Sequence, residues 1–515
     1  MSYLIGIDIG TTGTKTILVD ENGHQQASAL EEYPLHTPQP KWAEQDPEDW
    51  WQATIKTLKT VVAESGVDKT AIKGIGLSGQ MHGLVAMDRK SQVLRPSILW
   101  CDVRTTDQCH YITETVGRDL LLQSTCNPAL EGFTAPKVIW LREHEPEIYQ
   151  QTSTIFLPKD YVRFRLTGEV AMEVSDAAGT LLFDVKERAW SQPVLDLLGI
   201  DADLLPQTYE SVDVCGQISG EVAELTGLQA GTPVVGGGAD NACSAVGNGI
   251  VREGRVSASL GTSGVVLAHS DEVKVDPNLR LHSFCHSVPN KSYIMGVMLS
   301  AGGAYRWFRD TVADREVAEA RTAGVDPYEL LGQQAKTAPV GSEGLIFLPY
   351  LTGERTPHAD ANARANFFGL TLRHQRSHLI RSVMEGVTYG MRDSLELIRD
   401  LGATVTQIYT TGGGARSPLW RQIQADIYQA EVVTINIAEG PAFGAAILAG
   451  VGTGVYQSVE AATDQMVEIT SSTQPISENV EIYNQYYQIY RDLYPALKPQ
   501  FDQVTQVVAQ QSSDN

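Results

Sequence analysis

Short apolar runs separated by glycine-containing turns mark the start of the chain. Residues 3–9 are apolar apart from Asp8 and predict a strand. Residues 14–19 predict a second strand, and the glycines within residues 10–13 predict the turn between the two. The chain is therefore expected to open with a β-hairpin.

The apolar spacing then changes from strand-like to helical. Asp46 and Pro47 have the character of an N-cap and a first helical residue. The core-facing stripe predicted for this helix consists of Trp51, Ile55, Leu58 and Val62. Residues 72–77 predict a further strand, followed by a glycine-bracketed turn at residues 79–83. This alternation of strands and helices predicts α/β layers.

The second half of the chain continues in the same style. Residues 407–411 predict a strand that runs into the glycines 412–414 and then into a helix that begins at residues 417–418. This order is typical of phosphate or ribose binding, although tight turns also use three glycines. Residues 510–515 are polar and are expected to fray. A tyrosine stripe at helical spacing predicts the docking face of a last helix: Tyr483, Tyr486, Tyr487, Tyr490 and Tyr494.

Length and charge narrow the classes of protein. With 515 residues, the chain is long enough for about two large domains or three small ones. Hydrophobic residues make up 42% and charged residues 20%, which excludes disorder and coiled coil as descriptions of the whole chain. No run approaches the roughly 18–20 apolar residues of a membrane helix. The charge of −23, from 39 basic and 62 acidic residues, argues against nucleic acid as the main partner, but not against small phosphorylated ligands.

The N-terminus and the cysteines bear on the compartment. Residues 1–10 carry no basic region, and Asp8 interrupts the apolar run, so we expect no signal peptide. The six cysteines are sparse for a chain of this length and include no C-x-x-C pair. We expect reduced, mostly buried thiols in a cytoplasmic protein.

Two segments far apart in the chain share one pattern. Residues 8–13 read DIGTTG and residues 259–264 read SLGTSG, each with glycines and hydroxyl residues at a turn between predicted strands. Glycine lets the backbone approach a ligand closely, and hydroxyl groups supply donors. One such turn alone would indicate an ordinary hairpin. Two at matching places in two halves favour two similar lobes that bind one phosphate chain.

Asp240 is the candidate carboxylate for chemistry. Residues 233–235 predict a strand that meets the glycines 236–238, and Asp240 then opens a helix. One interpretation is an N-cap aspartate. The other is a general base, since a helix N-terminus favours the ionised carboxylate that a base requires. The glycines add room for a substrate beside this carboxylate.

Two further segments carry polar groups that suit a polyhydroxylated ligand. His82 lies between glycines after a strand, where α/β folds place ligand contacts, although a lone histidine is more often structural. Trp100, Asp102 and Arg104 supply an aromatic ring, a carboxylate and a guanidinium close together. Such a set can pack on C–H groups and bond hydroxyls. The alternative is a surface salt bridge beside a core tryptophan.

From its start to about residue 495, the sequence resembles the FGGY carbohydrate kinases. Within that family, residues 80–83 (QMHG), 175–185 (SDAAGTLLFDV) and 282–286 (HSFCH) are most similar to the xylulokinases. The segments that carry the family resemblance, in the family's order, are DIGTTGTK (8–15), GQMHG (79–83), LRPSILWCDVR (94–104), GFTAPKVIWLREHEPEI (132–148), LPKDYVRFRLTGE (157–169), GGGADNA (236–242), LGTSGVV (260–266), PYLTGERTPH (349–358), FFGLTLRHQRSHLIRSVMEGV (367–387) and GGGARSPLW (412–420).

The resemblance implies an α/β fold of two actin-like, ribonuclease H-like domains with an interdomain cleft. It implies an N-terminal kinase domain over residues 1–250 that binds the sugar and carries the catalytic base. A C-terminal kinase domain over residues 251–495 would bind the nucleotide, and residues 496–515 would form a polar tail.

The resemblance also implies roles for individual residues. Asp240 would be the catalytic base, and Asp8 would be the carboxylate of the Mg²⁺ site, directly or through water. The implied substrate-binding residues are Met81, His82, Trp100, Asp102, Arg104 and Asn241. The implied ATP-binding residues are Thr11, Thr12, Lys15, Gly261, Thr262, Ser263, Gly413 and Gly414.

The implied function is ATP- and Mg²⁺-dependent phosphorylation of a ketopentose, with D-xylulose to D-xylulose 5-phosphate as the first expectation. Cys101 and Val103 stand where the bacterial xylulokinase pattern has Asn and Gly, so the sugar preference stays open. The first alternative is a kinase for another sugar or polyol, such as ribulose, gluconate or glycerol, and a remote one is an actin-like ATPase. Expected partners are the sugar and ATP, without nucleic acid or membrane; a homodimer is left open.

Overall fold

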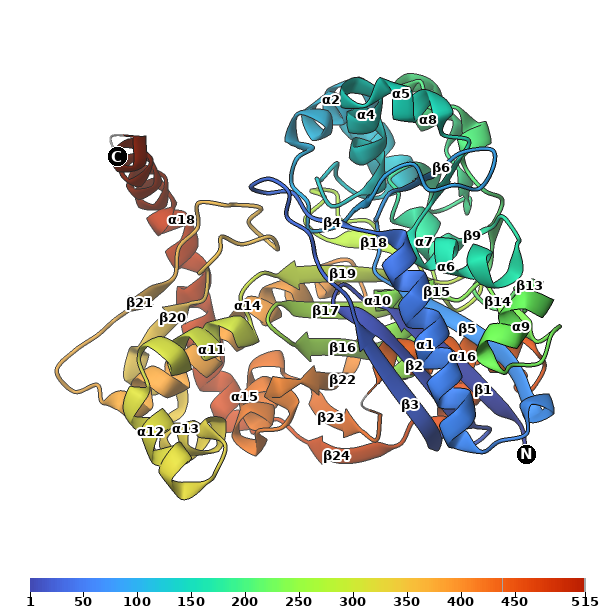
Figure 1. Ribbon diagram of the computed structural model, residues 1–515. Helices are drawn as coiled ribbons and strands as arrows, with labels where there is room; N and C mark the ends of the chain where they lie inside the picture. Colours follow the sequence, from blue (N-terminus) through green and yellow to red (C-terminus); the bar gives the residue numbers. More distant parts are fainter. Residues whose placement is uncertain (438, 514–515) are drawn as a thin grey trace. The chain divides into compact units, whose positions relative to one another are not determined.

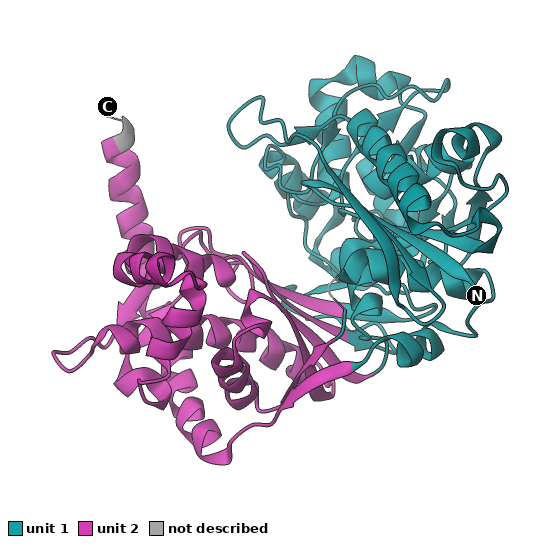
Figure 2. Cartoon of the chain, turned by 60° about the horizontal axis from the view of Figure 1, so that its bottom comes forward, with its two compact units in different colours: residues 1–252, 269–293, 436–468 teal, residues 253–268, 294–435, 469–515 magenta. Residues whose placement is uncertain are grey.

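The computed structural model describes residues 1–437 and 439–513 and divides into two compact units (Figure 2). Unit 1 comprises residues 1–252, 269–293 and 436–468. Unit 2 comprises residues 253–268, 294–435 and 469–515. Neither unit is one continuous stretch, so the chain passes from one unit to the other several times.

Unit 1 is built on a sheet with the strand order β13-β14-β5-β1-β2-β3, and β15 also pairs with β5. These strands are β1 (Tyr3–Ile9), β2 (Gly13–Asp20), β3 (Gln25–Glu32), β5 (Ile72–Gly79), β13 (Val214–Gln217), β14 (Pro233–Val235) and β15 (Gly238–Ala239). β1 runs antiparallel to β2, whereas β5 is parallel to β1, β14 and β15. The predicted opening hairpin and the strands predicted at residues 72–77 and 233–235 are confirmed (Figure 1).

Helices cover both faces of this sheet. Those of unit 1 include α1 (Pro47–Ser65), α2 (Thr106–Val116), α4 (Thr134–His144), α5 (Pro146–Gln151), α6 (Pro158–Thr167), α7 (Val174–Ala178), α8 (Gln192–Leu198), α9 (Gly220–Thr226), α10 (Asp240–Gly247), α16 (Gly440–Gly452) and α17 (Val459–Met466). α1 packs on β2 and β3, and α16 packs on β1 and β5. Alternate residues of β1 serve the two faces: Ile5, Ile7 and Ile9 join the core with α1, and Leu4 joins the core with α16.

The N-terminus of α1 is capped as the sequence predicts. Asp46 is the N-cap, and its side chain accepts the backbone N–H of Glu48 at 2.9 Å. Pro47 is the first helical residue. This capping bond satisfies one of the N–H groups that the first turn of a helix leaves unpaired.

The buried face of α1 is rotated from the predicted stripe. Ile55 and Val62 are only half-buried, whereas Thr54 and Thr57 are fully covered. The Thr54 hydroxyl donates to a carbonyl one turn earlier at 2.7 Å, and the Thr57 hydroxyl pairs with that of Thr16 at 2.7 Å. A hydropathy pattern misses such positions, because a hydroxyl that is hydrogen-bonded inside the protein can be buried.

Unit 2 contains the same arrangement of strands. Its sheet includes the strands β19-β17-β16-β22-β23-β24, in that order. These strands are β16 (Gly254–Leu260), β17 (Gly264–Ser270), β19 (Ser292–Met298), β22 (Val405–Gly412), β23 (Glu431–Ile435) and β24 (Ile469–Thr473). β16 is antiparallel to β17 and parallel to β22, as β1 is to β2 and β5. The hairpin predicted around residues 259–264 and the strand predicted before the glycines 412–414 are confirmed.

The last helix of unit 2 carries the tyrosine stripe. The helices of this unit include α11 (Gly302–Thr311), α12 (Asp314–Ala323), α13 (Pro327–Ala335), α14 (Arg376–Asp400), α15 (Pro418–Tyr428) and α18 (Ser477–Ser513). Tyr483, Tyr487 and Tyr490 of α18 are buried, and the Tyr487 hydroxyl donates to Asp393 of α14 at 2.7 Å. The predicted docking face is confirmed. α18 continues to Ser513, beyond residue 510 where fraying was expected.

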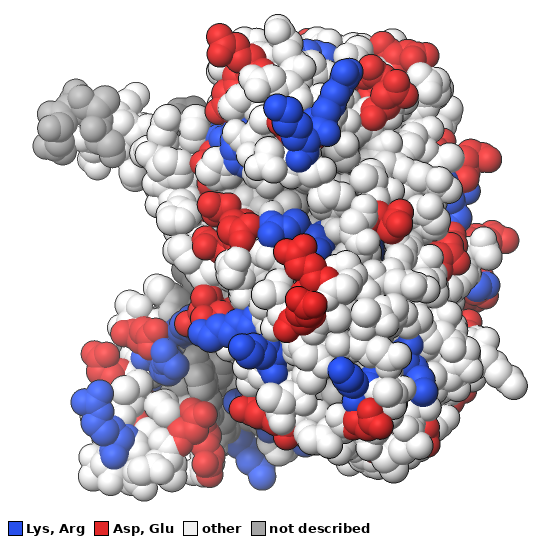
Figure 3. Space-filling model, turned by 45° about the vertical axis from the view of Figure 1, so that its right-hand side comes forward, with Lys and Arg blue, Asp and Glu red and all other residues white. Residues whose placement is uncertain are grey.

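Three observations concern membrane helices, the thiols and the charges at the surface. Among the described residues, no helix combines the length and the apolar character needed to cross a membrane. All six cysteines are free thiols, and all but Cys101 are buried. On the face shown in Figure 3, Lys and Arg side chains lie among Asp and Glu side chains.

Glycines in β1 and β5 allow α16 to lie backbone to backbone against the sheet. A Cβ on Gly6 would lie 1.8 Å from the carbonyl oxygen of Ala442, and one on Gly76 would lie 2.0 Å from that of Ala445. Both oxygens belong to the helix backbone and cannot rotate away. A methyl group at either glycine would therefore push α16 off the sheet.

We expect Gly76→Ala to lower the free energy of unfolding by about 1–3 kcal/mol or more, because it overpacks the contact between β5 and α16. Gly220→Ala is the matched control, since nothing lies within 4 Å of a Cβ added at this first residue of α9. Urea unfolding followed by circular dichroism measures both variants. Equal midpoints for the two variants would contradict the close-packing argument.

Candidate active site

Three strand ends meet at one edge of the sheet of unit 1. Asp8 of β1 lies opposite Ser78 of β5, and Ser78 lies opposite Gly238 of β15. These strands are parallel, so their carboxyl ends share one edge, which is where open α/β sheets bind ligands. α10 starts from this edge with Asp240.

Asp240 is half-buried, and its carboxyl group has a partner on its own helix. Asp240 is the first residue of α10 and Ala239 is the N-cap, so the interpretation of Asp240 as an N-cap is wrong. Its Oδ1 accepts the backbone N–H of Asn241 at 2.6 Å and the Asn241 side-chain amide at 3.0 Å. Burial raises the pKa of Asp240 to about 7, and the negative charge of Asp8 adds to the effect. Such a group can accept and release a proton near neutral pH.

The turn after β5 carries Met81 and His82. The Met81 sulfur lies 3.8 Å from the side-chain amide nitrogen of Asn241. His82 has a φ of 68°, which few non-glycine residues adopt. Its Nδ1 donates to the Gly179 carbonyl oxygen at 2.5 Å, and the ring lies 4.7 Å from that of Phe133 between centroids. The structure therefore brings this turn to the start of α10.

Two buried donors of α4 hold the carbonyl oxygen of His82. The Thr134 hydroxyl donates to it at 3.1 Å, and the Lys137 ammonium donates at 3.0 Å. Lys137 also donates to the carbonyl of Gly132. Burial lowers the pKa of Lys137 to about 7. Lys137 was not predicted from the sequence, where the only signal for it is a charged residue among the apolar residues of the segment 132–148.

The turn between β1 and β2 is tied to the turn after β5. Thr11 Oγ1 donates to Gln80 Oε1 at 3.1 Å and accepts from Trp100 Nε1 at 2.9 Å. The side-chain amide of Gln45 donates to the Thr11 carbonyl at 2.7 Å and accepts from Gln80 at 3.0 Å. The hydroxyl proton of Thr11 is thus engaged within the chain, whereas Thr12 is exposed. Gln80 was also not singled out, although it lies in the quoted segment 79–83.

Lys15 lies opposite Asp8 in the antiparallel pair of β1 and β2. Opposite residues of neighbouring strands share one face of a sheet, so both side chains lie on the α16 side. The Lys15 ammonium forms an ion pair with Glu439 Oε1 at 3.3 Å, at the start of α16. Burial raises the pKa of Asp8 to about 6, and the Glu439 carboxylate contributes.

Asp102 and Arg104 form a buried ion pair. Arg104 Nη2 lies 2.7 Å from Asp102 Oδ2 and 2.7 Å from Glu44 Oε1. The guanidinium carbon lies 3.6 Å from the centroid of the Trp42 ring. Trp100, in contrast, is 45% exposed. The salt bridge is therefore buried rather than at the surface, and Trp100 is exposed rather than in the core. The alternative of a surface salt bridge beside a core tryptophan is wrong.

Unit 2 contains a cavity of about 970 Å³ at the carboxyl ends of β16 and β22. Gly261 and Thr262 line it from the hairpin turn, and Gly413 and Gly414 line it from the turn after β22. Ser263 is exposed at the tip of the same hairpin turn. The residues predicted to bind nucleotide in the second half thus lie around one sheet edge.

Glycine backbones form the inner wall of this cavity. The Gly302 N–H at the start of α11 donates to the Gly261 carbonyl at 2.8 Å, and a Cβ on Gly302 would lie 2.4 Å from that oxygen. Gly412 has a φ of 77°, and a Cβ there would lie 2.4 Å from the Leu260 carbonyl oxygen. Only glycine lets α11 and the end of β22 lie this close to the hairpin.

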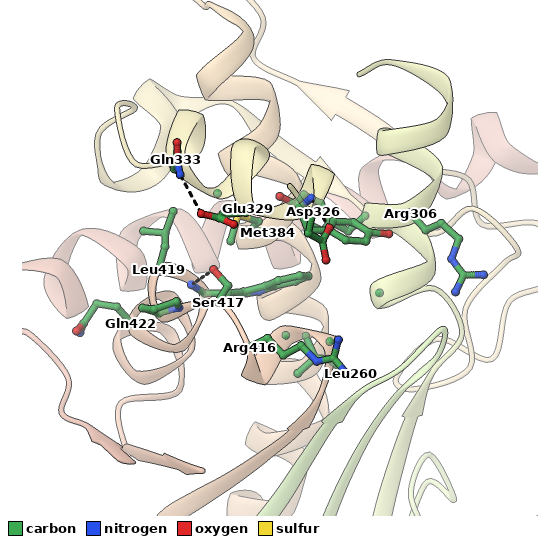
Figure 4. A pocket seen from close by; sticks show the side chains of 18 of the residues that line it. Leu260, Arg306, Asp326, Glu329, Gln333, Met384, Arg416, Ser417, Leu419 and Gln422 are labelled. Carbon is green, nitrogen blue, oxygen red and sulfur yellow. Dashed lines mark hydrogen bonds between the residues drawn. The ribbon is translucent and has the colours of Figure 1, made fainter. Parts of the chain in front are cut away.

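Aromatic and polar side chains form the outer walls (Figure 4). The Tyr305 ring stacks on Tyr328 with centroids 5.3 Å apart, and Trp420 meets Tyr305 edge-on at 5.1 Å. From α13, Gln333 donates to Glu329 at 3.4 Å. Apolar walls with a few polar groups are typical of small-molecule sites. None of these wall residues was predicted, because they come from three helices that are separated in the chain.

Comparison with known proteins assigns the family. Residues 3–247 match the N-terminal domain of the FGGY family of carbohydrate kinases, and residues 256–453 match its C-terminal domain. The chain belongs to this family. The matches confirm the predicted fold class of two actin-like, ribonuclease H-like α/β domains.

Relatives of this FGGY kinase match over nearly its whole length. The xylulose kinase of Bacillus subtilis (strain 168) is 44% identical over 498 residues, which cover 97% of this chain and 98% of that protein. The gluconokinase of the same organism is 33% identical and covers 98% of both chains. The crystal structure of xylulose kinase from Rhodospirillum rubrum superimposes with a TM-score of 0.90 at 31% identity, covering 97% of this chain and 100% of the other.

The pKa of Asp240 predicts a pH-dependent effect of Asp240→Asn on stability. An ordinary aspartate has a pKa of 3.8, whereas Asp240 in the folded kinase has one near 7. Between these values the folded state keeps a proton that the unfolded chain has lost, so stability falls as the pH rises from about 4 to 7. An asparagine carries no charge and does not contribute to this loss.

We therefore expect Asp240→Asn to raise the thermal midpoint by about 3 °C or more at pH 8, which corresponds to roughly 1 kcal/mol in a domain of this size. The gain should shrink towards pH 4. Differential scanning calorimetry at both pH values measures it, with Asp107→Asn in the exposed first turn of α2 as the control for a lost surface charge. A variant less stable than the wild type at pH 8 would contradict the burial argument.

Proposed function

We propose that this FGGY kinase transfers the γ-phosphoryl group of ATP to the 5-hydroxyl of D-xylulose. The observation that carries the proposal is the Asp240 carboxyl group at a shared strand edge, with a pKa raised to about 7 and Asn241 and Met81 beside it. The similarity to several xylulose kinases supports D-xylulose as the acceptor.

Asp240 would act as the general base. The transferred phosphoryl group carries its charge on its own oxygens, so the enzyme mainly has to position both substrates and remove the hydroxyl proton. A base with a pKa near 7 suits this task, because about half of it is ionised at neutral pH and the ionised form is still basic enough to accept the proton. The hydrogen bonds from Asn241 fix the orientation of the carboxylate.

The sugar would bind along the turns of unit 1. Met81 and His82 would contact the ketose, with the His82 carbonyl fixed by Lys137. Trp100 offers an exposed aromatic face. The charges of Asp102 and Arg104 are paired with each other inside the protein. We therefore propose that both residues shape the pocket, and that they contact sugar hydroxyls only through polar atoms that this pairing does not use.

The nucleotide would bind mainly in the cavity of unit 2. Gly261, Thr262 and Ser263 would face the phosphates, and Gly413 and Gly414 would lie against the nucleoside. The backbone N–H groups of glycine turns suit phosphate oxygens. Thr11, Thr12 and Lys15, at the turn of unit 1, are also proposed as ATP-binding residues, with Thr12 as the exposed hydroxyl of the three.

Asp8 is the residue proposed to hold Mg²⁺, directly or through water. Its Oδ1 is buried and has no hydrogen-bond partner among the described residues, which fits an oxygen that a hydrated cation would use. Within the same residues, no three or more His, Cys, Asp or Glu side chains are grouped to hold a metal ion. This also fits Mg²⁺, which keeps several waters and takes one or two carboxylates. When bound, Mg²⁺ neutralises charge on the phosphate oxygens.

The remaining proposals concern organisation and compartment. We assign sugar binding and base catalysis to residues 1–250, nucleotide binding to residues 251–495 and no catalytic role to residues 496–515. The family matches at residues 3–247 and 256–453 support the first two. The six free thiols support the proposal that the enzyme acts in the reducing cytoplasm.

The choice of sugar has one competing candidate. Gluconate is favoured by the gluconokinase among the relatives. Cys101 is half-buried and Val103 is 41% exposed on either side of Asp102, and neither side chain can accept a hydroxyl hydrogen bond well. Discrimination between these acceptors therefore depends on pocket size and on the few polar contacts that remain.

A coupled assay of ADP release over an acceptor panel tests the proposal. With ATP and Mg²⁺, D-xylulose should give a kcat/KM about tenfold or more above D-ribulose, D-gluconate and glycerol, since a misplaced or missing hydroxyl leaves polar groups of the site unpaired. A higher kcat/KM for D-gluconate would show that D-gluconate, and not D-xylulose, is the preferred acceptor. ATP turnover that no acceptor stimulates would support the ATPase alternative instead.

Asp240→Asn is expected to lower kcat for the sugar by roughly 10²–10⁴-fold, because the amide keeps the shape but cannot accept the proton. ATP and D-xylulose should still bind, as measured by titration calorimetry. A fall in kcat below about tenfold would show that Asp240 is not the base, since it lies outside the range for general-base loss.

A further inference from the structure

Unit 1 buries five charged side chains next to the segment that leads into Asp240. All five have no exposed surface. They are Lys159, Asp160 and Arg163 of α6, Glu173 as the N-cap of α7, and Asp176 within α7. Charges are seldom buried so completely unless they are paired and hydrogen-bonded. The group is named the ionic cluster below.

The positive charges of the ionic cluster are shared among its carboxylates. Lys159 Nζ lies 3.0 Å from Asp160 Oδ1, 3.3 Å from Asp176 Oδ2 and 3.8 Å from Glu173 Oε2. Arg163 Nη2 lies 3.0 Å from Asp160 Oδ1. Three carboxyl groups face two cations, and burial raises the pKa of Asp176 well above its usual range, with Asp160 and Glu173 adding to the effect. A protonated Asp176 leaves the cluster electrically balanced.

The ionic cluster reaches the segment 236–239 at both ends. At the first end, the Gly236 carbonyl accepts from Lys159 Nζ at 3.3 Å and from Arg163 Nη1 at 3.0 Å. At the other end, the Ala239 N–H donates to Ser175 Oγ at 2.9 Å, and the Ser175 hydroxyl donates to Glu173 Oε2 at 2.7 Å. Ser175 thus connects the cluster to the residue directly before Asp240.

The start of α10 has no cap of its own. Its N-cap residue is Ala239, whose methyl side chain cannot accept a hydrogen bond. Gly238, one residue earlier, has no side chain to anchor the turn. The direction in which α10 leaves the sheet, and with it the direction of the Asp240 carboxylate, is therefore fixed by groups from other elements.

We propose that Ser175 is a positioning residue for the phosphoryl transfer: it holds Ala239 from α7 so that the Asp240 carboxylate faces the acceptor hydroxyl. The inference rests on the proposed function of Asp240 as the base. Ser175 would act through Ala239, without touching the sugar or ATP. A base displaced by about 1 Å can lose about 10²-fold in rate, so a single hydroxyl at this place has a large effect on kcat.

Ser211 provides a matched control. Its side chain is as fully buried as that of Ser175, and its hydroxyl donates to the other oxygen of the same carboxylate, Glu173 Oε1, at 2.6 Å. Within the described residues, this hydroxyl bonds to Glu173 alone. Ser211→Ala therefore removes one hydroxyl bond to Glu173, as Ser175→Ala does, but leaves the bond to Ala239 in place.

The experiment compares steady-state kinetics and thermal midpoints of the full-length wild type, Ser175→Ala, Ser211→Ala and Ser175→Cys. Ser175→Cys keeps the size of the side chain with a weaker acceptor and guards against a folding failure of the alanine variant. All four are assayed with the acceptor that the wild type phosphorylates best. Circular dichroism and the thermal midpoint report folding.

We expect Ser175→Ala and Ser175→Cys to lower kcat about tenfold or more, with the KM for sugar and for ATP unchanged within about twofold. Ser211→Ala should keep the wild-type kcat although the loss of its bond to Glu173 lowers its thermal midpoint. Equal kcat values for the two alanine variants, or a change confined to KM, would overturn the inference. A wild type that phosphorylates no acceptor would overturn the proposed function instead.

Discussion

The parallel pairing of β1, β5 and β15 is the constraint on which the site of unit 1 depends. Because the register places Asp8, Ser78 and Gly238 in one row, the next residues of all three strands leave the sheet at the same edge. The turns that carry Thr11, Met81 and the start of α10 must then lie side by side. The register is what brings these residues together, since Asp8 and Ser78 are 70 positions apart in the chain and Ser78 and Gly238 are 160 apart.

The same edge in unit 2 is built with different chemistry. There the hairpin after β16, the start of α11 and the end of β22 approach one another through glycine backbones, and aromatic rings stack in the walls beside polar side chains. In unit 1, a buried lysine and a buried ionic cluster hold the corresponding turns. The difference suits the proposed division of work, because a base must keep a fixed direction, whereas a nucleoside needs a flat surface to pack on.

The features that local chemistry determines were the ones that could be predicted. The two hairpins, the Asp46–Pro47 start of α1 and the strands before the glycine turns follow from patterns a few residues long. Asp240 and His82 were singled out because glycines flank them. The buried face of α1 was misplaced, since buried threonines look polar in a sequence. The burial of Asp102 and Arg104 could not be predicted, because it depends on Glu44 and Trp42, some 60 residues earlier in the chain.

The discontinuity of unit 1 has a consequence for its synthesis. One face of its sheet is completed only by α16, whose residues Ala442 and Ala445 lie against Gly6 and Gly76. At a translation rate of about 5–20 residues per second, the ribosome makes the last of these residues roughly 20–90 s after the first. During that time the apolar α16 side of β1 and β2, with Leu4, Ile17 and Val19, lacks the α16 residues that complete its core. The unit therefore cannot fold to completion as it emerges, and this exposed face is the surface that a ribosome-associated chaperone would have to protect.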